Sequence, residues 1–217
     1  MNDVIKTVIN RGYAEITEKK SRFIANISPV KSEDEAKAFI DEIKKSHYNA
    51  RHNVFAYIIG ENSELKRFSD DGEPQGTAGM PVLNVLVSED IKNTIIVVTR
   101  YFGGILLGTG GLVRAYTAAA KAGLEDAGIC EIQLYRRFEI SCDYTLNGKI
   151  QYELLKGGYF VEDTVFTERV KFKILVENER AEGFVKMITE LTSAKAEVTE
   201  TDILRGACKD GSFKLYE

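Results

Sequence analysis

The residues whose types and spacing best suit ligand chemistry lie in a glycine-rich stretch between two apolar segments. The sequence VVTRYFGGILLGTGGLVRAYTAAA occupies residues 97–120 and places five glycines within residues 103–111. Glycine permits positive φ angles and close approach of the backbone, and the first turn of a helix offers unpaired N–H groups to an anion. The stretch therefore suggests a phosphate-binding loop.

Neither of the common nucleotide-binding motifs fits this stretch. In a Walker A loop, lysine and then serine or threonine follow the second glycine, whereas Thr109 and Gly110 follow Gly108 here. The dinucleotide fingerprint needs a third glycine at a set spacing and a later acidic residue, and Gly108, Gly110 and Gly111 do not meet that spacing. We therefore expect neither Walker-type ATP hydrolysis nor dinucleotide binding, and we predict no cofactor.

Two interpretations of the glycine stretch remain open. Arg100 directly follows an apolar run and Arg114 lies about one turn into the helix, so their guanidinium groups are candidates to hold an anion near the free amides. Alternatively, Gly103 and Gly104 make a turn, the later glycines let a helix pack closely on a sheet, and both arginines pair with carboxylates. Glycine serves either purpose, so its presence does not decide between them.

A second candidate loop, FSDDGEPQGTAGMP, occupies residues 68–81. Asp70, Asp71 and Glu73 are candidates for general acid–base chemistry or for holding Mg²⁺. The alternative is an acidic β-turn with Gly72 at positive φ, which is the commoner meaning of Asp-Gly. We favour the turn and predict no catalytic residue and no metal site.

The histidines and cysteines carry little further chemistry. His47 lies at the end of a predicted helix, where a cation is ordinary, and His52 opens a predicted strand, where it is either structural or an RNA-stacking group. The three cysteines are scattered, without the spacing of a zinc site or a disulfide framework. They are Cys130, Cys142 and Cys208.

The composition limits the class of protein. Of 217 residues, 44% are hydrophobic and 29% are charged, which is typical of a globular chain rather than a disordered or membrane-embedded one. Residues 1–131 carry 16 Lys+Arg against 18 Asp+Glu, and residues 132–217 carry 13 against 15, so each part has a net charge of −2. Nucleic-acid binding would therefore need a local basic patch. Without a signal peptide or an apolar span, we expect a cytoplasmic protein that does not contact membranes.

The elements that must position the two loops are a sheet and three helices. Ser32 and Glu35 form a capping box, and the apolar stripe that follows predicts a helix ending near His47. The other expected elements are a hairpin over residues 12–30, strands over residues 53–60 and 93–98, and a helix over residues 111–128 closed by Gly128. Pro81 also suits the first turn of a short helix, although the valines that follow would equally suit a strand.

The second half of the chain has a different pattern. Strand-like and helix-like stretches alternate in the order βαββαβ from about residue 134, the last helix beginning at Asn178 as N-cap. This order is that of a ferredoxin-like domain. We therefore predict an α+β protein with domains at residues 1–133 and 134–217. Residues 203–217, which include a Lys209-Asp210-Gly211 turn, are left unplaced.

Four stretches together resemble the IMPACT family, in its bacterial YigZ/YvyE branch. They are SRFIA at Ser21, ARHNVFAYIIG at Ala50, FSDDGEPQGTAGMP at Phe68 and VVTRYFGGILLGTGGLVRAY at Val97, and the match extends over about residues 1–200. The resemblance implies an N-terminal domain like ribosomal-protein domain 2 and domain IV of elongation factor G. It also implies a ferredoxin-like C-terminal domain like domain V of that factor.

The resemblance further implies a regulatory role in translation. Eukaryotic members are implied to compete for a partner of a stress-responsive initiation-factor kinase, and bacterial members are implied to bind nucleic acid or the ribosome. The leading hypothesis is therefore a non-enzymatic protein that binds RNA, the ribosome or a translation-factor protein. The expected contact residues are Arg22, His52, Asp71, Glu73, Arg100, Tyr101, Gly103, Gly104, Gly108, Gly110, Gly111 and Arg114. Alternative hypotheses are a hydrolase acting on a small phosphorylated or peptide substrate through the acidic residues, and a protein-interaction domain using the C-terminal half.

Overall fold

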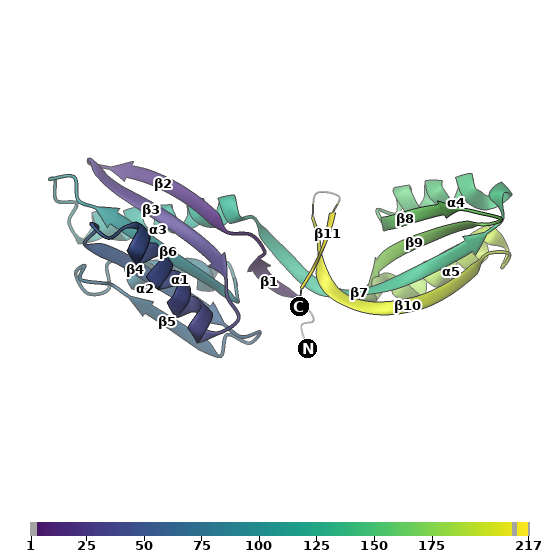
Figure 1. Cartoon of the computed structure of the whole chain (residues 1–217), viewed down its shortest axis with the longest axis horizontal. Coiled ribbons are helices and arrows are strands. Elements are labelled where there is room, and N and C mark those ends of the chain that lie inside the picture. The colour runs from purple at the N-terminus through teal and green to yellow at the C-terminus, as the bar shows by residue number, and fades with distance from the viewer. Residues whose placement is uncertain (1–3, 210–211, 217) are drawn as a thin grey trace. The chain divides into compact units, whose positions relative to one another are not determined.

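The chain divides into two units at the junction of Cys130 and Glu131, inside strand β7 (Ile129–Cys142). The computed structural model describes residues 4–209 and 212–216, and Figure 1 shows the elements of each unit in chain order. The sequence predicts a turn at Lys209-Asp210-Gly211, and Asp210 and Gly211 lie outside the described residues.

The first unit is built on an antiparallel sheet with the strand order β2-β3-β6-β4-β5. Its central strand β6 is buried over seven consecutive residues, as expected for a strand covered on both faces. The hairpin and both predicted strands are confirmed. The strands of this sheet are β2 (Gly12–Glu18), β3 (Ser21–Pro29), β4 (His52–Ile59), β5 (Leu65–Ser69) and β6 (Thr94–Tyr101), and β1 (Ile5–Val8) lies outside it.

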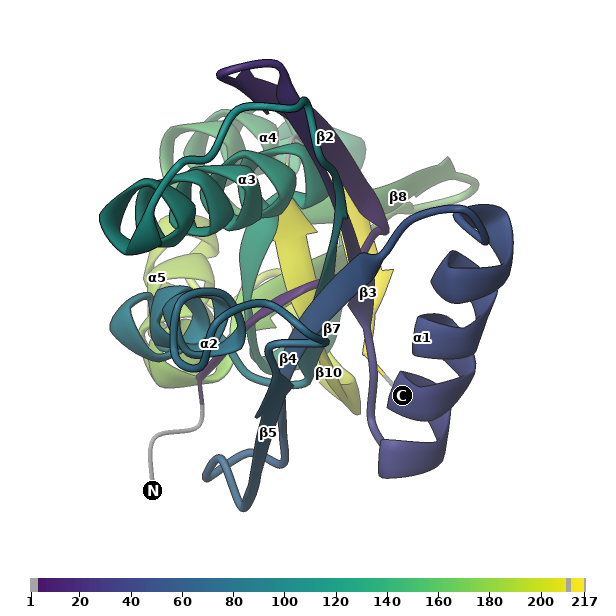
Figure 2. The same ribbon diagram turned by 90° about the vertical axis from the view of Figure 1, so that its left-hand side faces the viewer.

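Helices cover both faces of this sheet. Helix α1 (Glu33–Ser46) packs on one face, and helices α2 (Gly79–Ser88) and α3 (Thr109–Ala127) pack on the other, as Figure 2 shows. The capping signal at α1 is confirmed, since Ser32 Oγ accepts a hydrogen bond from the Glu35 amide. The Glu35 carboxylate accepts from the Lys31 amide instead of completing the box at Ser32.

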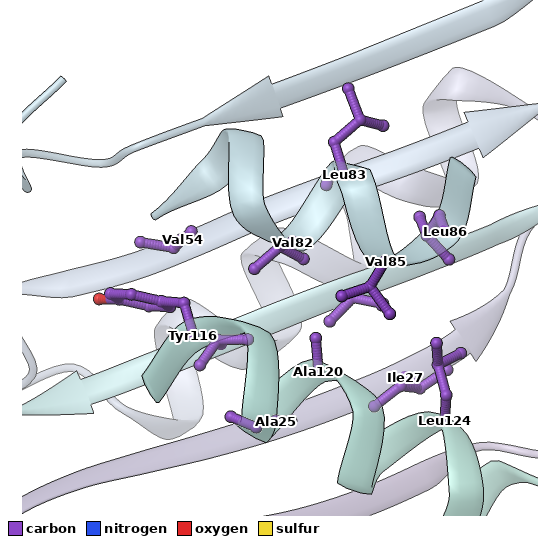
Figure 3. Close-up of a cluster of buried hydrophobic side chains, with 14 of the residues drawn as sticks. Ala25, Ile27, Val54, Val82, Leu83, Val85, Leu86, Tyr116, Ala120 and Leu124 are labelled. Atoms are coloured by element: carbon purple, nitrogen blue, oxygen red, sulfur yellow. The ribbon is translucent and has the colours of Figure 1, made fainter. Parts of the chain in front are cut away.

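The larger core of this unit lies between the sheet and helices α2 and α3. Figure 3 shows side chains of α2, among them Val82 and Val85, facing Tyr116 and Ala120 of α3 above the strands. The small alanine side chains of α3 let this helix approach the sheet closely. The helix that follows the glycine stretch is therefore packed directly on the strands. The smaller core, on the opposite face, holds the apolar stripe of α1.

The second unit has the predicted βαββαβ order. Its sheet is antiparallel, with strand order β11-β10-β7-β9-β8, and the helices pack on one face around a separate core that contains Phe138, Phe172 and Phe184. The ferredoxin-like prediction is confirmed. After β7, the elements are α4 (Tyr144–Lys156), β8 (Phe160–Phe166), β9 (Val170–Glu177), α5 (Ala181–Thr192), β10 (Glu197–Lys209) and β11 (Ser212–Leu215).

Three sequence expectations need correction. Asn178 is not the N-cap of α5, because Asn178–Arg180 forms a 3-10 turn and α5 begins at Ala181. The start of the second loop was read as turn residues, but Leu65–Ser69 forms the edge strand β5 against β4. The unplaced tail extends β10 and adds β11, which pairs with it from Gly206↔Leu215 onward.

Among residues 4–209 and 212–216, no helix is long and apolar enough to cross a membrane.

Candidate functional site

The segment between β6 and α3, residues 102–108, is the glycine loop. At Gly103, a side chain would overlap the backbone of Lys20, and the Gly103 amide donates to Ser21 Oγ at 3.2 Å. Gly108 is the N-cap of α3 with φ 72°, a conformation that disfavours other residues. These two glycines therefore shape the corner between strand and helix. Gly104 is exposed at φ 84°, and Gly110 and Gly111 lie in the first turn of α3.

The segment between β5 and α2, residues 70–78, is the acidic loop. The Asp70 carboxylate accepts hydrogen bonds from the backbone amides of Gly76, Ala78 and Gly79, at 2.8, 3.1 and 2.8 Å. The backbone carbonyl oxygen of Asp70 accepts a hydrogen bond from the Glu73 amide, which closes the turn. Gly72, inside that turn, has φ 86°. The carboxylate of Asp70 thus holds the loop and the start of α2 in shape, as expected for the turn interpretation.

Asp71 ties the acidic loop to the start of β4. Its carboxylate accepts from the Asn53 amide at 2.6 Å and lies 3.4 Å from Lys44 Nζ. Its carbonyl oxygen lies 2.9 Å from His52 Nδ1. Asp71 has φ 43°, which only these surrounding contacts make acceptable for a residue other than glycine. His52 is therefore held by this loop rather than presented on the surface as a stacking group.

The acidic loop meets the two elements that flank the glycine loop, β6 and α3, in a buried network of Glu73, Arg100 and Tyr116. Arg100 Nη1 donates to both carboxylate oxygens of Glu73, at 2.7 and 3.0 Å, and Tyr116 Oη donates to one of them at 2.8 Å. The side chains of Glu73 and Arg100 are only 3% and 7% exposed. Burial, followed by the nearby Glu73 charge, raises the pKa of Tyr116 far above its usual range, so Tyr116 remains a hydrogen-bond donor.

This network corrects the expectation that Arg100 lies on a binding surface. The Arg100 guanidinium is packed between the rings of Phe23 and Phe102, with its central carbon 5.4 and 5.6 Å from their centroids. Reversing the charge at Arg100 would leave two buried negative groups facing each other, so an Arg100→Glu substitution would disrupt the fold rather than only a binding surface. The alternative of pairing with a carboxylate holds for Arg100.

The other two expected arginines differ from each other. Arg22 is exposed, but Arg22 Nε and Nη2 donate to both carboxylate oxygens of Glu15, at 2.7 and 3.0 Å. Arg114 is also exposed, and its side chain has no hydrogen bond or ion pair within the described residues. Arg114 does not converge with Arg100, so the predicted pair of guanidinium groups around one anion is not formed.

Tyr101, at the end of β6, belongs to a separate polar group. Tyr101 Oη donates to Asn49 Oδ1 at 3.1 Å and lies 3.0 Å from His47 Nδ1. Burial, and secondarily the positive charge of Arg22, lower the pKa of His47 below its usual value. His47 is therefore mainly neutral at physiological pH and ties the end of α1 to β6.

The carboxylates and histidines do not assemble into a metal centre. Within the part of the chain that the structure describes, no group of three or more His, Cys, Asp or Glu side chains is arranged to hold a metal ion. The three acidic-loop carboxylates each contact different groups of the chain itself. Their contacts fix the shape of the loop.

A groove lies beside the glycine loop. It has a volume of about 220 Å³, and its walls include Ile16 of β2, Leu107, and Gly111, Arg114 and Ala118 of α3. Next to the groove, three large apolar side chains of the glycine loop are exposed to solvent. The exposed fractions are 53% for Phe102, 42% for Ile105 and 83% for Leu106.

Each of the two units matches a known protein family model. A family model described as the Impact N-terminal domain matches residues 19–124, and one described as a domain of unknown function (DUF1949) matches residues 140–195. The protein described as IMPACT family member YvyE of Bacillus subtilis (strain 168) is 46% identical over 197 residues, which cover 91% of each chain. The chain belongs to the IMPACT family.

Further IMPACT relatives and a solved structure extend this assignment. The Dictyostelium discoideum protein described as Protein IMPACT homolog is 42% identical over 97 residues, covering 43% of this chain and 28% of that protein. A crystal structure described as that of a hypothetical protein has 27% sequence identity and a TM-score of 0.59, and the match covers 93% of this chain and 99% of that chain. The two-unit fold is therefore shared with a solved structure.

Sequence reasoning located both loops of this IMPACT protein but missed several residues of the site. Tyr116 was read as part of a helix, and its contact with Glu73 joins residues 43 positions apart. The apolar loop residues Ile105 and Leu106 were given no role in the sequence-based interpretation. Their signal was present, since large apolar side chains in a loop between glycines have few places to be buried.

Proposed function

We propose that this protein is a regulatory binding protein of translation, which acts by contacting RNA, the ribosome or a translation factor. Membership of the IMPACT family supports the translational role, because the resemblance implies that role for family members. The observation that carries the proposal is the exposed surface of the glycine loop, where Ile105 and Leu106 lie exposed on a corner whose Gly103 amide donates to Ser21 Oγ. Exposed apolar groups on a rigid support are typical of a recognition surface.

The contacts of the acidic loop favour binding over hydrolysis. A catalytic acid or base needs access to a substrate proton. Glu73 is buried under Arg100 and Tyr116, and the Asp70 carboxylate is occupied by backbone amides. We therefore assign these carboxylates to the support of the surface.

The proposal distinguishes contact residues from supporting residues. Arg22 and Arg114 are placed in contact with the partner, as are the exposed glycines Gly104, Gly108 and Gly110, because their surfaces are open to solvent. The supporting residues are those whose side chains or close packing fix the shape of the loops. They are His52, Asp71, Glu73, Arg100, Tyr101, Gly103 and Gly111.

Co-sedimentation with bacterial ribosomes tests this function. We expect Arg114→Glu to reduce the fraction of protein that sediments with ribosomes, and the wild-type fraction to fall as salt rises, because contacts with phosphate or acidic groups are screened. Lys121→Glu is the matched control, since it reverses an exposed cation two turns further along α3, outside the groove lining. It should sediment like the wild type.

A translation assay provides the regulatory readout. Purified protein added to a cell-free translation reaction should change reporter yield in a dose-dependent manner, and Arg114→Glu should weaken this effect. Equal sedimentation of all three proteins, together with an unchanged reporter yield, would contradict the proposed function.

A further inference from the structure

We propose that the groove beside the glycine loop is a docking site for an acidic segment of a protein partner, which inserts an apolar side chain into the groove. This inference rests on the proposed function, because it names the chemistry of the partner at the same surface. The groove lies between the β2–β3 turn and the first turns of α3, with Leu107 between them.

The inner wall of the groove is apolar. Ile16 and Leu107 pack against the buried core of the unit, and Ala115 and Ala118 present only methyl groups. A liquid water molecule occupies about 30 Å³, so a groove of about 220 Å³ holds the volume of several waters. An apolar side chain can replace that water with a gain in free energy, whereas a charged group would lose its hydration there.

The rim of the groove is positively charged. Lys19 and Arg114 line it, and Lys20 follows Lys19 in the same turn. All three side chains are exposed and have no hydrogen bond or ion pair within the described residues, in contrast to Arg22, which is held by Glu15. Glu18 also lines the groove, so the local charge is positive but not uniformly so. This charge suits an acidic segment.

The turn that carries the lysines gives independent support. The register Glu18↔Ser21 makes Lys19 and Lys20 the two central residues of a tight hairpin turn, with φ 45° and 67°. Such a turn favours Asn and Gly, because other side chains are strained at positive φ. The backbone of this turn alone would favour Asn and Gly at these two positions. The two lysines are therefore better explained by their positive charge beside the groove than by the stability of the turn.

The exposed aliphatic residues favour a protein partner over RNA. Single-stranded RNA is held by aromatic side chains on which bases stack, together with many phosphate contacts. Next to this groove, Leu106 and Ile105 are aliphatic and cannot stack, and Phe102 is the aromatic residue of the loop. An apolar patch with a charged rim is instead typical of a protein–protein interface.

Fluorescence anisotropy with defined probes tests the inference on the full chain. The first probe is a short fluorescein-labelled peptide of Glu and Asp residues with one central Leu. The second probe has Ser in place of Leu, and the third is a labelled oligouridylate of similar charge. We expect the Leu peptide to bind about tenfold more tightly than the Ser peptide, since burial of a leucine side chain supports at least that ratio.

Variants of exposed residues locate the binding site. Ala118→Phe fills the groove, and Arg114→Glu reverses the charge of its rim, so each should weaken the Leu peptide about tenfold or more. Leu106→Ser should weaken it as well. The matched control is Leu155→Ser, which changes a leucine of α4 that is 82% exposed, close to the 83% of Leu106, and should leave binding unchanged. Circular dichroism confirms that each variant is folded.

The outcomes separate this inference from the proposed function. Equal affinity for the Leu and Ser peptides, tighter binding of the oligouridylate, or insensitivity to Ala118→Phe overturns the docking inference. If ribosome sedimentation still depends on Arg114 in that case, the proposed function stands without it. If the Leu peptide binds in the groove but translation yield and sedimentation never change, the docking site stands and the translational role fails.

Discussion

The sequence suggests Arg100 as a ligand contact, but the structure buries it in an ion pair with Glu73. Its guanidinium group neutralises Glu73 inside the protein, and the hydroxyl of Tyr116 completes the hydrogen bonding of that carboxylate. A buried charge pair is costly to break at one member, because the remaining charge is left without a partner or water. The three side chains therefore act as one unit that joins the acidic loop to β6 and α3.

Substitutions in this network should be strongly destabilising. Arg100→Met leaves the Glu73 carboxylate buried without its cation, and we expect a loss of about 3–5 kcal/mol in the free energy of unfolding. Tyr116→Phe removes one hydrogen bond to a charged group and should cost about 1.5–3 kcal/mol. Urea denaturation measures both.

A double substitution tests whether the three residues act together. The combined loss in Arg100→Met with Tyr116→Phe should differ from the sum of the single losses, because the residues share Glu73. Simple additivity, or a loss below about 1 kcal/mol for Arg100→Met, would contradict the network.

His47 should titrate below its ordinary value of 6.5, because burial and the Arg22 charge both disfavour its protonated form. The unfolded chain then binds the proton more readily than the folded chain. The stability contributed by neutral His47 is fully present above pH 6.5 and is lost as the pH falls through the folded-state pKa. An NMR titration of the His47 ring measures that pKa.

Arg22→Gln provides the control for this titration. Removing the nearby positive charge should move the His47 pKa upward, though not fully to 6.5, since burial is the larger cause. If the His47 ring of the wild type titrates with a midpoint at or above 6.5, burial does not lower its pKa and the prediction is wrong.

At the scale of elements, the glycine loop is a corner whose glycines have unequal importance. A side chain at Gly103 would overlap the backbone of Lys20, whereas a Cβ at Gly110 would meet only Arg114 Nη1, at 3.7 Å. The backbone of β3 cannot move as a flexible side chain can. The loop therefore depends on Gly103 for its contact with the β2–β3 turn.

Alanine substitutions should separate these two glycines. Gly103→Ala should lower the free energy of unfolding by more than about 2 kcal/mol, because the β2–β3 turn must move. Gly110→Ala should be neutral or should stabilise by about 0.4–1 kcal/mol, as alanine reduces the freedom of the unfolded chain. Thermal unfolding compares them, and equal effects would contradict the close approach at Gly103.

The sequence predicts elements well where their signals are local. Helix α1 follows from Ser32 and the apolar stripe, and both depend on residues within a few positions. Strand β5 was missed because it is an edge strand whose Lys66 and Arg67 face solvent, so it lacks an apolar alternation. Pairing with β4, rather than its own residues, fixes it as a strand.

The candidate site was predictable only in part for the same reason. Glycines and acidic residues mark the loops, but the contact between Arg100 and Glu73 spans 27 positions and depends on the strand order. A polar residue after an apolar strand has no local signal that distinguishes an inward from an outward side chain. The exposure of Leu106 likewise depends on how the loop leaves β6.

At the scale of the molecule, each unit has a hydrophobic core of its own. The cores on both faces of the first sheet draw their residues from positions 8–127, and the core of the second unit draws on positions 138–198. Domains with separate cores can unfold in separate steps. We therefore expect more than one cooperative step in the unfolding of the chain.

A core substitution in the second unit tests this expectation. Phe184 is fully buried against Phe138 and Tyr159, so Phe184→Ala should cost about 3–5 kcal/mol. Hydrogen exchange measured by mass spectrometry should show faster exchange after residue 131, with the first unit unchanged. Faster exchange throughout the chain would indicate a single cooperative unit.

The turn between β2 and β3 has a consequence for how variants of this protein should be judged. Asn-Gly in place of Lys19 and Lys20 would relieve the strain of the positive φ angles and strengthen the hairpin, while removing the cation of Lys19 from the rim of the groove and that of Lys20 from the same turn. The substitution should therefore raise the melting temperature of the protein while it lowers the positive charge beside the groove. A gain in thermal stability at this turn is thus tied to a loss of surface charge.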